Sequence, residues 1–114
     1  MSSYVLILEN CEERTLQVGK LRRIRFEPGY YYYVGSAKRI ARVTRHFKAK
    51  TKKWHIDYVS DVFTIVGAIL FKISECELAS KIKLERIPGF GCSDCDCDSH
   101  LFYSKNLTIE NLLA

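Results

Sequence analysis

The sequence predicts a single α+β domain over residues 1–114, in which a small central antiparallel sheet of about three main strands is flanked by helices. Three observations lead to this fold class. Short apolar runs of strand composition alternate with segments of helical spacing. A chain of 114 residues buries roughly two thirds of its unfolded surface, which is enough for one core. Finally, no repeat, linker or second domain is visible along the sequence.

The first third of the chain has the composition of strands and turns. Residues 4–9 form a short apolar run, which is typical of a central strand. Residues 15–18 and 21–26 predict a hairpin. Residues 30–35 predict an aromatic strand that ends in a tight turn and leads into a helix.

That helix is predicted over residues 38–48. Ile40, Val43 and Phe47 repeat at spacings of three and four, so we expect them to form its buried stripe. Its other faces are expected to carry Arg39, Arg42, Arg45 and His46.

The rest of the chain alternates helical and strand-like segments. The expected elements are a short helical turn at 54–60, a buried strand at 63–73, a helix at 75–86, a short strand at 101–103 and a last helix at 108–113. Ser74 and, three residues later, Glu77 resemble a capping box at the start of the 75–86 helix.

Composition limits the class of protein. Hydrophobic residues make up 47% and charged residues 27%, which is ordinary globular usage and argues against disorder. The longest apolar run, 62–71, is far short of the roughly 20 residues of a membrane-spanning helix. The first residues lack the features of a secretory signal. We therefore expect a cytoplasmic chain with no membrane partner, whose five cysteines do not form a disulfide framework.

The positive charge of the chain belongs to one segment. No acidic residue lies between Pro28 and Ile56, although the formal net charge of the whole chain is only +5. Such a segment indicates an anionic partner, and the interspersed aromatic residues favour nucleic acid, with DNA first. The alternative is a solvated helix face. The candidate nucleic-acid-binding residues are Lys38, Arg39, Arg45, Lys48, Lys50, Lys52 and Lys53.

The junction between the aromatic strand and the basic helix suits phosphodiester chemistry. It brings Tyr33 near Arg42 and His46, and the last two share a helix face because they are four positions apart. A guanidinium pairs with a phosphate, while a phenol or an imidazole positions or deprotonates the attacking water. Sheet packing for the tyrosine and an ordinary surface role for the histidine are the alternative interpretations.

Several strings of this sequence resemble the GIY-YIG nuclease superfamily. Tyr33-Val34-Gly35 is similar to the second half of its motif, and Ser2-Ser3-Tyr4 to a degenerate first half. Arg42 stands at the place of the family arginine, and His46 stands where the family often has His or Tyr. Strings at 54–58, 75–79 and 88–103 are similar to a branch of small microbial proteins, which are sometimes fused to an endonuclease III type repair enzyme.

The resemblance implies a metal-dependent endonuclease that hydrolyses phosphodiester bonds of DNA, in repair or at particular DNA structures. It also implies that the first and second motif tyrosines lie on neighbouring strands, with the 15–26 hairpin taking up the chain between them. The catalytic residues that it implies are Tyr4, Tyr33, Arg42 and His46.

The resemblance further implies a metal and a partner. Glu75 or Glu77 is expected to hold one divalent ion, Mg²⁺ or Mn²⁺, and hard cations do prefer carboxylate oxygens. The fused relatives suggest a repair protein as a partner.

The Cys-rich loop allows two interpretations. Three thiols and one imidazole can make a tetrahedral zinc site, which here would be Cys92, Cys95, Cys97 and His100. Because the spacing is tight and the intervening aspartates add charge, a hydrogen-bonded loop that lines the active groove is favoured over zinc. That loop would use Ser93, Asp94 and His100.

Two other functions remain open at this point. One is a nucleic-acid-binding module that does not cleave, and the other is a zinc-stabilised adaptor for a partner enzyme. His55 and Asp57 are interpreted as locally pairing or capping residues, with a functional role as the alternative.

Overall fold

The computed structural model describes residues 2–48, 51–92, 97–110 and 112–113, and it shows an α+β domain built on a five-stranded antiparallel sheet. The strand order is β5-β1-β4-β7-β6, and β2 and β3 form a separate hairpin. The strands are β1 (Ser3–Asn10), β2 (Arg14–Val18), β3 (Arg22–Phe26), β4 (Gly29–Ser36), β5 (Thr64–Phe71), β6 (Glu85–Arg86) and β7 (Leu101–Ser104). The helices are α1 (Ile40–Thr44), the 3₁₀ helix η1 (Arg45–Phe47), α2 (His55–Ser60) and α3 (Glu75–Lys81).

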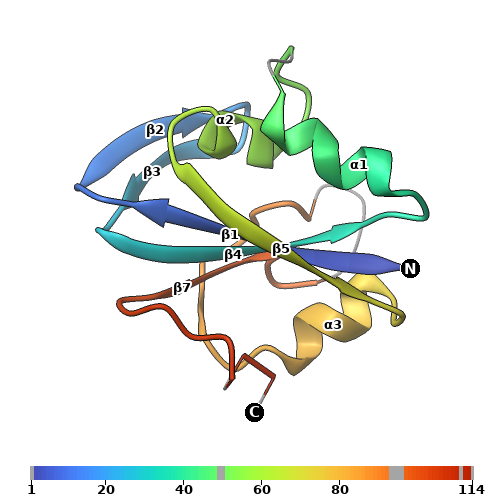
Figure 1. The fold of residues 1–114 in the computed structure, drawn as a ribbon. Coiled ribbons are helices and arrows are strands. Elements are labelled where there is room, and N and C mark those ends of the chain that lie inside the picture. The colour runs from blue at the N-terminus through green and yellow to red at the C-terminus, as the bar shows by residue number, and fades with distance from the viewer. Residues whose placement is uncertain (1, 49–50, 93–96, 111, 114) are drawn as a thin grey trace.

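The central strands are buried on both faces. The hairpin, α1 and α2 cover one face of the sheet, and α3 covers the other (Figure 1). Along β1, Tyr4, Leu6 and Leu8 enter the first core, while Val5 and Ile7 enter the second. Two covered faces explain why β1 has a continuous apolar run instead of an alternation of apolar and polar residues. Within the described residues, no helix is long and apolar enough to cross a membrane.

The predicted α+β class is confirmed, and the hairpin lies where the sequence places it. The sheet is larger than three strands because β7 pairs with β4 and the two-residue β6 pairs with β7. The strand expected to be buried, 63–73, is instead the edge strand β5, in which exposed and half-buried residues alternate. Val66 and Leu70 keep 48% and 46% of their surface exposed.

The predicted 38–48 helix is wrong in its buried stripe. Val43 is buried, but Ile40 and Phe47 are 54% and 57% exposed, and His46 is buried in their place. The chain makes only one α-helical stretch before it tightens into η1. A 3₁₀ turn has about 3.0 residues instead of 3.6, so the phase of the helix changes and His46, not Phe47, faces the sheet.

Two further helix predictions are wrong in extent. α3 ends at Lys81, because Ile82 takes an extended backbone and residues 85–86 then pair with β7. In the predicted last helix, the described residues of 108–113 form only bends and turns. The Ser74 cap is present, since its hydroxyl accepts a hydrogen bond from the Glu77 N–H at 3.2 Å.

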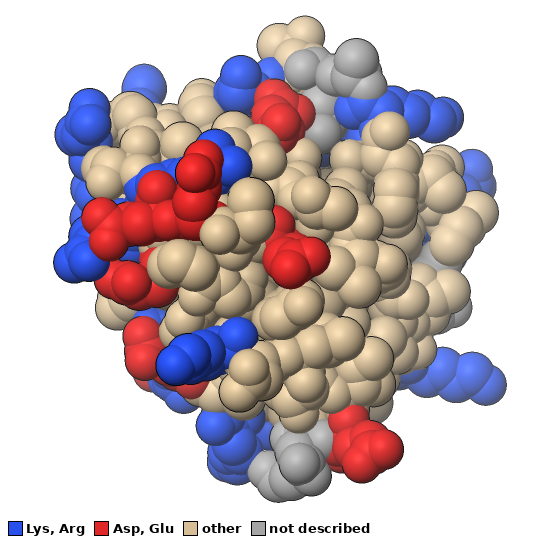
Figure 2. All heavy atoms as spheres, turned by 60° about the vertical axis from the view of Figure 1, so that its left-hand side comes forward, with Lys and Arg blue, Asp and Glu red and all other residues tan. Residues whose placement is uncertain are grey.

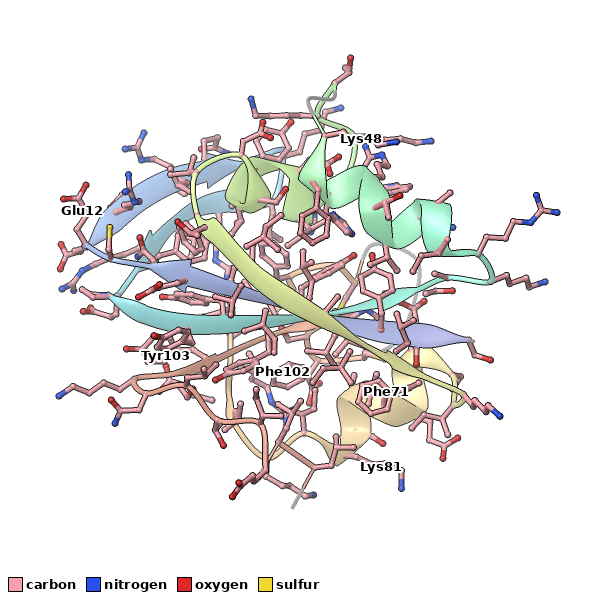
Figure 3. All side chains as sticks on the ribbon, in the orientation of Figure 1. Glu12, Lys48, Phe71, Lys81, Phe102 and Tyr103 are labelled. Carbon is pink, nitrogen blue, oxygen red and sulfur yellow. The ribbon has the colours of Figure 1, made fainter. Side chains whose placement is uncertain are left out.

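The α3 side of the sheet is packed by aromatic residues. Phe71 of β5 and Phe102 of β7 both point into the layer between the sheet and α3 (Figure 3). Lys48 and Lys81 lie on opposite sides of the sheet (Figure 3). Lys48 of the basic segment therefore lies on the α1 side of the sheet, whereas Lys81 at the end of α3 lies on the other side (Figure 3).

Candidate active site

A cleft of about 290 Å³ opens between the ends of β1 and β4, the helices α1 and α2, and the start of α3. It brings together residues that are far apart in the chain. The residues that line it are Tyr4, Tyr33, Ser36, Arg42, Lys53, Trp54, His55, Glu75 and Gly91.

Tyr4 enters this cleft across a glycine of the neighbouring strand. Tyr4 and Gly35 are paired residues of β1 and β4. A Cβ atom at position 35 would overlap the Tyr4 ring and hydroxyl. A glycine at position 35 is therefore required by the close approach of Tyr4. The Tyr4 hydroxyl then reaches the buried His46, whose Nε2 is 2.6 Å away.

Tyr33 lies beside Tyr4 on the next strand. Their ring centroids are 6.3 Å apart, and the Tyr33 ring also meets His46 edge-on at 6.1 Å. Burial raises the pKa of both phenols well above their usual range, and the opposing effect of Arg42 on the pKa is smaller. Both tyrosines are thus neutral at pH 7. In this state their hydroxyls can donate hydrogen bonds, but they are not ionised bases.

Arg42 is an exposed residue of α1 that is held at the cleft by an aromatic ring. Its guanidinium carbon lies 4.7 Å from the centre of the Trp54 ring, and that of Arg45 lies 4.2 Å from the same centre. Cation–π contacts of this kind orient a guanidinium without neutralising it. Arg42 remains able to pair with an anion that enters the cleft.

Arg45 has a structural partner. Its guanidinium donates two hydrogen bonds to the buried Asp57 carboxylate, at 2.8 and 2.9 Å. The backbone N–H groups of Lys53 and Trp54 also donate to Asp57. Burial alone would raise the pKa of Asp57, but these hydrogen bonds outweigh it and lower the pKa to about 2. The network fixes the start of α2, and with it Trp54.

His55 connects α2 to the loop after β6. Its Nδ1 accepts a hydrogen bond from the Gly91 N–H at 2.9 Å. Gly91 has a φ of +74°, a conformation that favours glycine. Burial, and then the charge of Arg22, lower the pKa of His55. A neutral His55 that accepts at Nδ1 carries its proton on Nε2.

The structure separates the two candidate glutamates. Glu75 lines the cleft with 31% of its side chain exposed, and its Oε2 lies 3.4 Å from Nδ1 of the buried His100. Glu77 is exposed on α3 and is not among the cleft residues. One carboxylate therefore faces Arg42 and the two tyrosines.

A possible metal-binding group lies next to this cleft, with a different composition from the one expected. Within the described residues it consists of Cys76, Cys97 and His100, whose ligand atoms all lie within 4.8 Å of one another. Cys76 of α3 was not among the expected ligands, whereas Cys92 is outside the group. The expected loop residues Ser93, Asp94 and Cys95 lie outside the described residues.

The predicted basic residues have different surroundings in the structure. Among the described ones, only Lys53 lines the cleft. Lys52 pairs with Asp61 at 3.4 Å, and Arg45 is bound to Asp57. Exposed positions outside the cleft are occupied by Lys38, Arg39 and Lys48, and Lys50 lies outside the described residues.

Positive and negative side chains are mixed on the hairpin side of the molecule. On the face shown in Figure 2, Lys and Arg side chains lie among Asp and Glu side chains beside a broad uncharged area. Arg25 of the hairpin pairs with Glu13 at 2.6 Å and with Glu27 at 3.0 Å. Arg25 is therefore neutralised locally.

Of the cleft residues, Ser36, Trp54 and Gly91 are not among the candidates from the sequence, and His55 is interpreted there as a locally pairing or capping residue with a functional role as the alternative. Trp54 and His55 stand in the string 54–58 that carries part of the family resemblance, which was the available signal. Gly91 likewise stands in the string 88–103 of the resemblance, whereas nothing in the sequence marks Ser36, the last residue of β4, as a cleft residue.

Comparison with known proteins identifies the family to which this chain belongs. No curated protein and no solved structure matches the chain. One family model, described as domain of unknown function DUF123, matches residues 3–113. This match spans nearly all of the sequence, and the chain therefore belongs to the DUF123 family.

Proposed function

We propose that this chain is a metal-dependent endonuclease of the GIY-YIG type that hydrolyses phosphodiester bonds of DNA. The observation that carries the proposal is the convergence of two phenols, one guanidinium and one carboxylate on the same cleft. Those groups belong to Tyr4, Tyr33, Arg42 and Glu75, and they come from four different elements.

The cleft suits a phosphodiester by charge and by size. Arg42 and Lys53 supply positive charge at its wall, and Arg42 forms no ion pair within the described residues. A guanidinium can pair with two phosphate oxygens and follow the charge that builds up on them during attack by water. This is the role that we assign to Arg42.

Tyr4 has an imidazole nitrogen within reach that can accept its proton in this mechanism. A buried phenol with a raised pKa does not ionise alone at pH 7. The Tyr4 hydroxyl, however, lies 2.6 Å from His46 Nε2. Tyr4 can therefore take a proton from the attacking water while its own proton moves to His46. Tyr33, on the neighbouring strand, would orient the same water.

Glu75 fits a hard divalent cation such as Mg²⁺ or Mn²⁺. It offers a partly exposed carboxylate beside the phosphate position, and such ions bind through one or two carboxylates together with phosphate oxygens and water. When bound, the ion would stabilise the charge on the leaving oxygen. Water adds to phosphorus, the bond from phosphorus to the leaving oxygen breaks, and the products are a phosphomonoester and an alcohol.

The test is cleavage of branched, nicked and single-stranded DNA with Mg²⁺ or Mn²⁺. Tyr33→Phe and Glu75→Gln should each lower the cleavage rate by at least about 100-fold. Each has a matched control at a site outside the cleft: Tyr30→Phe on the same strand and Glu77→Gln on the same helix turn. The controls should cleave at rates close to that of the unmodified chain.

A second candidate function is nucleic-acid binding without cleavage. The raised pKa of both phenols favours it, since neutral tyrosines bind phosphate as donors without activating water. If every DNA is bound but none is cut, and binding still depends on Arg42, this second function replaces the nuclease.

A further inference from the structure

We infer that Cys76, Cys97 and His100 form a binding site for one thiophilic divalent metal, with Zn²⁺ as the expected ion. This site is separate from the carboxylate that we assign to Mg²⁺. It does not depend on the proposed nuclease activity.

The first argument is geometric. The two thiols and the imidazole offer ligand atoms that all lie within 4.8 Å of one another. In a tetrahedral zinc site, with bonds of about 2.3 Å to sulfur and 2.0 Å to nitrogen, ligand atoms lie about 3.5 to 3.8 Å apart. The three side chains need to move by only about 1 Å to meet this requirement.

The second argument is chemical. Two thiolates and a neutral imidazole around Zn²⁺ have no net charge, so the ion does not bring an uncompensated charge to the half-buried site. Sulfur and imidazole ligands select soft or borderline metals over Mg²⁺, which prefers oxygen. The sulfur and imidazole ligands therefore favour Zn²⁺ at this site, whereas the Glu75 carboxylate favours Mg²⁺.

The third argument concerns access and support. A surface cleft of about 320 Å³ has Cys76 and Cys97 in its lining, so an ion can reach them from solvent. His100 is held in place by its backbone, whose N–H donates to the Phe90 carbonyl and whose carbonyl accepts from the Val34 N–H, both at 2.8 Å. The described residues supply three of the four ligands of a tetrahedral ion.

The position of the site gives it a structural consequence. Cys76 belongs to the first turn of α3, and Cys97 and His100 immediately precede β7. A shared ion would cross-link these two elements. His100 also lies beside Glu75, and an imidazole that binds metal through one nitrogen keeps a proton on the other for such an acceptor.

A disulfide between Cys76 and Cys97 is the competing account. A disulfide requires the two sulfur atoms to approach to about 2.05 Å, and it gives no role to the imidazole. Within the described residues, no disulfide joins Cys76 to Cys97. The convergence of a third ligand therefore favours a metal.

The experiment is metal analysis of the full chain purified under reducing conditions without chelators. The unmodified chain should carry about one zinc per molecule, and Cys76→Ser and Cys97→Ser should each carry almost none. Cys11→Ser is the matched control, because Cys11 is an exposed free thiol outside the group, and it should retain the zinc. Circular dichroism of each variant reports whether it has folded.

Cobalt substitution keeps the inference testable even where a variant fails to fold. Co²⁺ added to the metal-free unmodified chain should produce thiolate charge-transfer absorption and the visible bands of tetrahedral cobalt. The inference is overturned by an unmodified chain that binds neither zinc nor cobalt, or by a Cys76–Cys97 disulfide in the purified protein. Retention of full zinc content by Cys76→Ser would also overturn it.

Discussion

The Tyr4 hydroxyl lies 2.6 Å from Nε2 of His46, although 42 positions of sequence separate the two residues. Both residues are only 2% exposed, and Tyr4 reaches solvent through the cleft that it lines. It joins the first strand of the sheet to the 3₁₀ turn that follows α1. In this place a phenol that burial keeps neutral lies within hydrogen-bond distance of an imidazole nitrogen, which is its proton acceptor in the proposed mechanism.

We predict that His46→Phe lowers DNA cleavage by about 100-fold or more, because the Tyr4 proton loses its acceptor. The free energy of unfolding of this variant should also be about 1 to 3 kcal/mol lower, since the buried Tyr4 hydroxyl loses its hydrogen-bond partner. Cleavage rates and urea unfolding measure the two effects. Cleavage at the unmodified rate by a folded His46→Phe would remove His46 from the mechanism.

Gly35→Ala should lower the free energy of unfolding by about 1 to 3 kcal/mol and displace Tyr4, because the new methyl group overlaps the Tyr4 ring. Gly67→Ala on β5 is the control, since a Cβ atom there meets no atom within 4 Å. It should be neutral or stabilising by up to about 1 kcal/mol. Equal losses in the two variants would show that strand glycine itself, and not the Tyr4 contact, is responsible.

Asp57 should make stability fall at acid pH. Its folded-state pKa is about 2, which is below the unfolded value of about 4. The carboxylate therefore stabilises the fold fully above pH about 4, and this contribution, about 2 kcal/mol, is lost as the pH falls toward 2. Unfolding free energies measured from pH 7 to pH 2 test the prediction.

Asp57→Asn is the matching variant. At pH 7 its free energy of unfolding should be about 3 kcal/mol lower than that of the unmodified chain, because Arg45 and two backbone N–H groups lose a charged acceptor. It should also remove part of the decline in the free energy of unfolding between pH 4 and pH 2. An unchanged acid decline in this variant would assign that decline to other carboxylates.

Arg42→Ala should weaken DNA binding and reduce the slope of log affinity against log salt by about 1, which is the effect of losing one phosphate contact. Arg39→Ala is the control, as Arg39 is an exposed arginine that lies outside the cleft. Binding titrations at several salt concentrations compare the two variants. If Arg39→Ala has the larger effect, DNA approaches the molecule at a place other than the cleft.

Much of the fold could be predicted from local patterns. The apolar run of β1, the turn signals of the β2–β3 hairpin and the cap at Ser74 each depend on residues close in sequence. The helix phase could not be predicted in this way. His46 is buried because the last turn tightens against the sheet, and no local spacing indicates that change.

The sequence alone determined the α+β class, the two motif tyrosines on paired strands and the placement of Arg42 on the helix that follows. Only the tertiary structure decided that Glu75 and not Glu77 faces them, that Cys76 joins Cys97 and His100, and that His55 reaches Gly91. The physical reason is one of range. Periodicity encodes which face of an element is buried, whereas convergence of side chains depends on how distant elements pack against one another.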